Sequence, residues 1–276
     1  MLRIIICQVK NILRSFAARA VFLVVFAVVL YNFFNNVFAF QGYDVIGMYH
    51  PMRLLTLSYD HAANYKADAM LLLIQLLPLL LCLPAGLSIA ADQSTGMDHM
   101  HICRLGASRY LLSRLIAVFL ATFLVFDVPF LLEFLLNCIS FPSKAAGDFE
   151  HLSMYDPRLA EKIAASGFQT IYKLSPYLYA LWKIVLFGLT AGFLAVITAA
   201  FSAAVRVRYR VFLLLPTFSL LSLSNYFGSR STQWYLYVSL FCNEPRQPLL
   251  PFVFILTGML LIGIFYSLGV KKDCLK

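Results

Sequence analysis

Charged side chains inside apolar segments are the residues of this sequence best placed to do chemistry. Asp127 lies near the middle of an apolar run at about 116–139. An uncompensated charge at the centre of a membrane costs roughly 2.5 to 3.5 kcal/mol on insertion scales, so this residue needs a partner or a use. Asp127 could bind a proton or a cation in a wet cavity, or it could be hydrogen-bonded between helices beside a kink at Pro129. The sequence leaves both roles open.

Glu133 and Lys183 are two further intramembrane polar residues. Glu133 lies nearer to the end of the same apolar run, and Lys183 lies at a similar depth in the antiparallel run that follows. Intramembrane charges usually pair with one another or with backbone carbonyls. We therefore predict an ion pair between Glu133 and Lys183.

The sequence contains none of the motifs that would give this chain catalysis of its own. It has no G-x-x-x-x-G-K-[ST] phosphate loop, no Gly-x-Ser-x-Gly and no His-Glu-x-x-His. His99 and His101 are two residues apart, so on a helix they would point in nearly opposite directions. The six cysteines have no metal-ligand spacing. We expect no enzyme activity, bound cofactor or metal in this chain.

The elements that position these groups are predicted to be membrane-spanning helices. The 276 residues are 61% hydrophobic and 13% charged, against roughly 45 to 50% and about 25% in soluble domains. A run of about 20 apolar residues is long enough to cross a bilayer as a helix. This predicts an all-α integral membrane protein with a single transmembrane domain over residues 1–276 and six transmembrane helices, at about 18–39, 69–91, 116–139, 178–205, 211–227 and 250–269.

The basic residues indicate how these helices are oriented. The net charge is +9, and 13 basic residues with only three acidic ones flank the N-terminus, the second and fourth connections and the C-terminal tail. The other connections carry eight basic and eight acidic residues. By the positive-inside rule, both termini are cytoplasmic and the chain is a multi-pass protein of the inner or plasma membrane. This placement explains the positive charge without nucleic-acid binding.

Segments outside the spans are predicted to lie on the two membrane faces. Residues 1–17 form an amphipathic pattern typical of an interfacial helix, although they could simply be a basic flank of the first span. The loop 140–177 is predicted to cap the outer face with a short helix that begins at Asp156-Pro157. Residues 233–241 suit an interfacial or re-entrant segment. In the fourth span, the GxxxG of Gly188 and Gly192 favours close helix packing, within the bundle or in a homodimer.

The connection between the second and third spans is the most informative segment. It begins with the capping residues Asp92, Ser94 and Thr95, continues at helical spacing, and breaks at Gly106 before a helix capped by Ser108. This predicts a short helix lying across the membrane face. The residues at helical spacing in this helix are Met97, Met100, His101 and Leu105.

This segment resembles the permease subunits of the ABC type-2 class of ATP-binding-cassette transporters. Their hallmark is an acidic residue and a glycine after the second span, a coupling helix, and a small-residue turn with Ser-Arg entering the third span. The residues that match this order are Asp92, Gly96, Arg104, Gly106, Ala107, Ser108, Arg109 and Arg114. Many members carry glutamate in place of Asp92 and proline near Gly106, so the register of the coupling helix is open.

The resemblance implies an exporter-like fold and a partner that supplies the energy. A separate cytosolic ABC ATPase subunit would bind ATP and Mg. Two permease subunits, identical or different, would form a pathway in the lipid bilayer that opens alternately to each side. Met97, Met100, His101 and Leu105 would then contact the ATPase, with ion pairs from Arg104 and Arg109. The apolar, aromatic spans favour export of a hydrophobic or amphipathic peptide, lipid or drug.

Two other functions fit the same sequence. An ion-coupled secondary transporter would use Asp127 as its coupling carboxylate, although such folds usually contain two related halves, which we do not detect. A membrane receptor or immunity protein would bind a peptide with the loop 140–177 and transport nothing. Dependence on ATP hydrolysis would separate both from an ABC exporter.

Overall fold

A computed structural model describes residues 2–42, 50–58, 68–142, 169–205, 212–213, 215–219 and 249–274 of the chain. Throughout these residues the regular structure is helical, with no strand. The elements in chain order are α1 (Leu2–Arg14), α2 (Phe16–Ala39), η2 (Pro51–Arg53), η3 (Thr56–Ser58), α3 (Asp68–Thr95), α4 (Met97–Leu105), α5 (Ala107–Ser140), α7 (Gln169–Leu174), α8 (Pro176–Ala204) and α11 (Leu249–Cys274).

Three of the described helices are long and apolar enough to cross a membrane, namely α2, α5 and α8. Their lengths of 24, 34 and 29 residues exceed the roughly 20 residues that a bilayer requires. Helices α3 and α11 are also long, with 28 and 26 residues. The described part of the chain is therefore all-helical and has the character of a membrane protein. The predicted span at 211–227 lies mostly outside the described residues, so a total of six spans stays a prediction.

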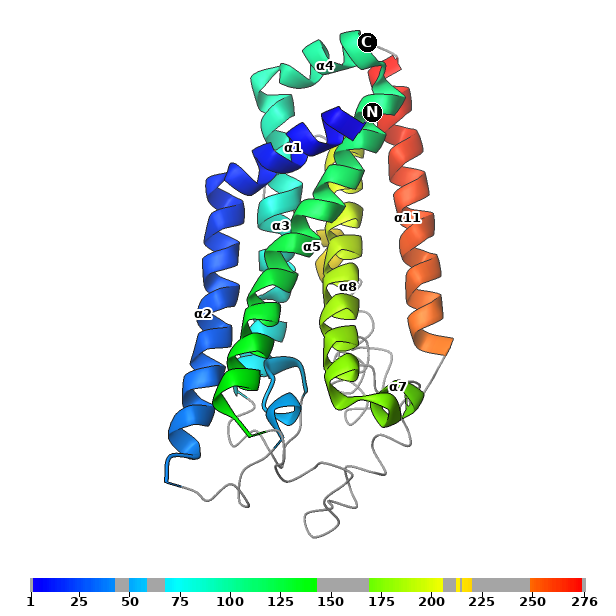
Figure 1. Ribbon diagram of the computed structural model, residues 1–276. Coiled ribbons are helices and arrows are strands. Elements are labelled where there is room, and N and C mark those ends of the chain that lie inside the picture. The colour runs from blue at the N-terminus through cyan, green and yellow to red at the C-terminus, as the bar shows by residue number, and fades with distance from the viewer. Residues whose placement is uncertain are drawn as a thin grey trace.

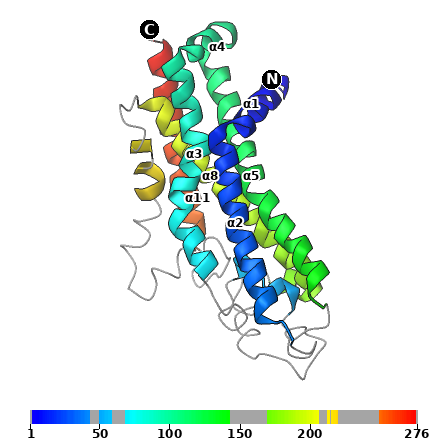
Figure 2. The same cartoon turned by 90° about the vertical axis from the view of Figure 1, so that its left-hand side faces the viewer.

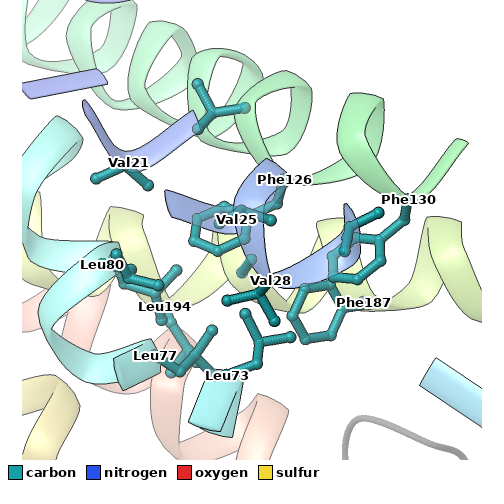
Figure 3. Packing of buried hydrophobic residues seen from close by; sticks show 14 of the residues in the cluster. Val21, Val25, Val28, Leu73, Leu77, Leu80, Phe126, Phe130, Phe187 and Leu194 are labelled. Carbon is teal, nitrogen blue, oxygen red and sulfur yellow. The ribbon is translucent and has the colours of Figure 1, made fainter. Parts of the chain in front are cut away.

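The long helices run side by side and share an apolar core (Figures 1 and 2). Figure 3 shows this core, in which α2, α3, α5 and α8 interdigitate. Phe187 of α8 contacts Phe126 and Phe130 of α5 edge-on, with ring centroids 6.0 and 5.1 Å apart. Edge-to-face pairs of this kind add to the energy of area burial. Apolar side chains outside the core, such as Leu23 of α2 and Leu135 of α5, are exposed as a lipid-facing surface requires.

The first helix is separate from the second and crosses the bundle (Figure 1). The break falls at Ser15, whose hydroxyl accepts a hydrogen bond from the backbone N–H of Ala18 and donates one to the carbonyl of Ile12. The apolar face of α1 packs on α5, with Ile12 buried and Val9 and Leu13 partly buried. The predicted amphipathic helix at 1–17 is thus observed at Leu2–Arg14.

Two ends of the bundle can be distinguished in Figure 1. The α4 end carries α1, α4 and the C-terminus of α11, while the opposite end carries α7 and the beginnings of α8 and α11. The sequence assigns the N-terminus, the second connection and the tail to one face, and the structure brings these three segments together. The predicted outer helix at Asp156-Pro157 and the segment 233–241 lie outside the described residues.

The predicted helix starts around the second connection are wrong in detail. Asp92, Ser94 and Thr95 were expected to begin a new helix, but they form the last turn of α3, and Gly96 precedes α4. Gly106, rather than Ser108, caps α5, and it does so without a side-chain hydrogen bond. The glycines end one helix and start the next because both have positive φ, 70° at Gly96 and 80° at Gly106.

Candidate functional site: the α4 surface and the buried polar groups

Helix α4 is a nine-residue segment that lies across the end of the bundle (Figures 1 and 2). It is joined to α3 by Gly96 alone and to α5 by Gly106 alone. Met97, Met100 and Cys103 of this helix are all exposed. The result is a short helix attached directly to a long helix at each end.

Two of the four α4 residues that the sequence predicts for contact with an ATPase are exposed, Met97 and Met100. Met97 is 49% exposed and Met100 67% exposed. Arg104 in the last turn is also exposed, whereas Leu105 is half-buried. Arg109, in the first turn of α5, is exposed as well. The side chain of His101 lies outside the described part of the structure.

Asp92 is held within the chain instead of facing outwards. Its Oδ2 forms an ion pair with the guanidinium of Arg114 at 2.7 Å and accepts a hydrogen bond from the hydroxyl of Tyr110 at 2.9 Å. Arg114 also donates to the carbonyl oxygen of Ser88 at 3.2 Å. These bonds join the end of α3 to the beginning of α5. Asp92 therefore positions the two helices that carry α4 and does not itself form the exposed surface.

A second contact joins this end of the bundle to the C-terminal helix. The hydroxyls of Ser108 in α5 and Tyr266 in α11 are 2.8 Å apart. Tyr266 also donates to the backbone carbonyl of Ser108 at 3.2 Å. The residue predicted to cap a helix thus connects two helices.

Asp127 is buried against α8 in the middle of α5. It is 3% exposed, and within the described structure its Oδ1 has no hydrogen-bond partner. The carboxyl group occupies the space that a side chain at Gly188 would need, since a Cβ there would lie 1.9 Å from Oδ1. Gly192, one turn further, similarly admits the ring of Phe119. The GxxxG of α8 is therefore used inside the bundle, to seat two side chains of α5.

The predicted ion pair between Glu133 and Lys183 is wrong. No ion pair joins these two residues, both of which the structure describes. The Oε1 atom of Glu133 accepts hydrogen bonds from the Nδ2 of Asn32 at 2.8 Å, and from the backbone N–H and hydroxyl of Thr56 at 2.8 and 2.7 Å. The ammonium group of Lys183 instead lies 4.8 Å from the ring centroid of Tyr179, a cation–π contact one helical turn away.

Sequence reasoning missed the residues that surround Glu133. Asn32 and Asn36 both donate to the carbonyl oxygen of Leu54 at 2.9 Å, and Asn137 is fully buried one turn beyond Glu133. One signal was present, because Asn32 and Asn36 are four residues apart and form a polar stripe on an otherwise apolar helix. Thr56 offered no comparable signal, since it lies in the connection between α2 and α3, where only the three-residue η3 forms around it.

Comparison with models of known protein families, with curated proteins and with solved structures finds no match.

Proposed function

We propose that this chain is the permease subunit of an ABC type-2 transporter that exports a hydrophobic or amphipathic substrate across the cell membrane. A separate cytosolic ABC ATPase binds ATP and Mg, and a second permease subunit completes the pathway. The observation that carries the proposal is the exposed apolar surface of α4, formed by Met97 and Met100 between two glycine joints.

The exposure of these methionines is the first support. Apolar side chains that face lipid need no protein partner, but α4 lies across the end of the bundle, where the flanking sequence is polar and basic. Flexible methionine side chains are suited to adaptable binding surfaces. Two exposed methionines one helical turn apart in such a place are suited to contact with a protein partner. The exposed Arg104 and Arg109 supply positive charge at its rim.

The attachment of α4 is the second support. A force on α4 acts directly on α3 and α5, because a single residue separates each pair of helices. The ion pair of Asp92 and Arg114 holds the ends of α3 and α5 together. Helix α5 in turn packs along α8 through the core of Figure 3. Closure of an ATPase against α4 would therefore shift the helices that line the core.

The test is purification of the tagged chain from its native cell in mild detergent. We expect a stoichiometric ATPase subunit and vanadate-sensitive ATP hydrolysis. The double change Met97→Asp and Met100→Asp should abolish both, because two charges replace the apolar contact. Cys7→Asp with Asn11→Asp is the matched control, since it adds two negative charges at exposed positions of α1 at the same end. Retention of the ATPase by the double variant would overturn the assignment of α4.

An ion-coupled transporter is the second candidate, and Asp127 is the observation that favours it. Its carboxyl is buried in the middle of α5, and one oxygen is left without a hydrogen-bond partner in the described structure. Such a carboxyl can accept a proton or a cation from a transient cavity. A chain that purifies without an ATPase, yet moves solute into liposomes under a proton gradient, would establish this function and exclude the exporter.

A further inference from the structure

We propose that residues 50–58 form a plug that closes the bundle at the end opposite α4, and that Glu133 is the latch that holds the plug in place. This inference rests on the proposed transport function, because a plug at that end would separate the interior of the helix bundle from the far side of the membrane. Its structural part, a buried segment held by one carboxyl group, can be tested without an ATPase.

The plug is buried although it is a connecting segment. Leu54 is 0% exposed and Thr56 1%. Leu54 packs with aromatic residues from α2 and from the end of α5, and Leu57 belongs to the main core that α2, α3, α5 and α8 share. Met52 and Leu55 pack around Ala180 of α8. Connecting segments usually run over the surface, so burial on several sides indicates a specific seat between the helices.

Two polar backbone groups of the plug, at Leu54 and Thr56, are bonded to side chains of two helices. The carbonyl oxygen of Leu54 accepts hydrogen bonds from Asn32 and Asn36 of α2. The backbone N–H and hydroxyl of Thr56 both donate to Glu133 of α5. Asn32 also donates to Glu133, so the same carboxyl connects α2, α5 and the plug. Separation of α2 from α5 would break this arrangement and release the plug.

The latch also contains polar atoms that favour opening. The Oε2 of Glu133 and both amide atoms of Asn137 are buried without a hydrogen-bond partner among the described residues. Buried polar atoms without partners lose the hydration that they would have in water. Water that enters when the plug moves would restore it. The hydrogen bonds to Oε1 therefore stabilise the closed plug, and the unpartnered atoms beside it destabilise the closed plug.

The experiment measures whether a probe at Leu54 is accessible from the far side. Leu54→Cys is placed in a chain whose native cysteines are replaced by serine, and sealed membranes are treated with a membrane-impermeant maleimide. We expect slow labelling in the parent, and labelling at least about tenfold faster with Glu133→Ala, because this change removes the acceptor of three hydrogen bonds and the loss of one can already give roughly that factor. Glu133→Gln should give an intermediate rate, because its amide oxygen can still accept from Thr56.

Matched variants separate release of the plug from general unfolding. Leu132→Ala truncates the exposed neighbour of Glu133 on α5 and should leave the labelling rate unchanged. Thr56→Val removes one of the three donors and should raise the rate less than Glu133→Ala. Rapid labelling of the parent, or equal rates with and without Glu133, would overturn the latch.

The role in transport has its own readout. When the copurified ATPase turns over ATP, the rate of labelling of Leu54→Cys should rise. Vanadate, which stops the hydrolysis, should prevent that rise. Hydrolysis with no change in labelling would overturn the gating role of the plug while leaving the exporter intact. Absence of an ATPase, with a protected Leu54→Cys that Glu133→Ala exposes, would overturn the proposed function and leave the latch standing.

Discussion

Replacement of Gly188 by alanine tests the contact between α5 and α8. A Cβ at this position would lie 1.9 Å from Oδ1 and 2.5 Å from Cγ of Asp127, far below any normal contact. The aspartate side chain is short, so the backbones of the two helices must separate to relieve the clash. Overpacking of this kind costs about 1 to 3 kcal/mol.

Gly263 of α11 provides the matched control. It also lies inside a helix, but a Cβ there meets nothing within 4 Å. Both changes gain the preference of alanine for the helix, about 1 kcal/mol in water. The difference between Gly188→Ala and Gly263→Ala therefore isolates the clash. At about 2 to 4 °C per kcal/mol, the melting temperature of Gly188→Ala in detergent should lie roughly 2 to 12 °C below that of Gly263→Ala.

The same measurement in a second background identifies the cause. When Asp127→Ala removes the carboxyl group, Gly188→Ala should no longer be destabilising, because the new methyl group enters the space that the carboxyl left. The double-mutant cycle should give a coupling energy of about 1 to 3 kcal/mol. An equal cost of Gly188→Ala with and without Asp127 would refute the packing that we describe.

Three further predictions concern single contacts. Ser15→Ala removes the cap of α2 and should cost about 1 kcal/mol, seen as a lower melting temperature; no change would mean that the break between α1 and α2 does not depend on this hydroxyl. Arg114→Ala should cost about 1 to 2 kcal/mol, since its partner Asp92 is partly exposed, and it should lower vanadate-sensitive ATP hydrolysis by the complex; full hydrolysis would argue against transmission through this pair. Exchange of the charges of Glu133 and Lys183 should fail to restore the expression lost in either single variant, whereas rescue would show that the two pair in the membrane.

The sequence predicts the long helices well because lipid imposes a simple requirement. A helix that crosses a bilayer needs about 20 apolar residues, and this length identifies a span without knowledge of its neighbours. The predicted range 18–39 became Phe16–Ala39, and 250–269 became Leu249–Cys274. The third helix exceeds its predicted range 116–139 by the largest margin, because α5 begins at Ala107, before its apolar part. The apolar run marks the part of a helix that crosses the membrane, but it does not show how far the helix continues through the polar residues beside it.

The candidate site was harder to predict where it depends on distant partners. The exposure of Met97 and Met100 follows from local spacing, and the sequence located the helix that bears them. The partner of Glu133 did not follow, because depth and charge favoured Lys183 while the observed donors include Thr56, 77 residues away in sequence. A buried carboxyl accepts any correctly placed donor, and only the packing of the plug decides which one is near.

The single-residue joints at Gly96 and Gly106 have a consequence for how this part of the chain can change in length. Most connections between helices tolerate insertions, because extra residues bulge into solvent. Here no such connection exists: one added residue inside α4 would turn its exposed face by about 100° relative to the following helix. Met97 and Met100 would then face another direction relative to α5. The stretch from α3 through α4 to α5 is therefore a unit of fixed length, in which substitutions can be accommodated and insertions or deletions cannot.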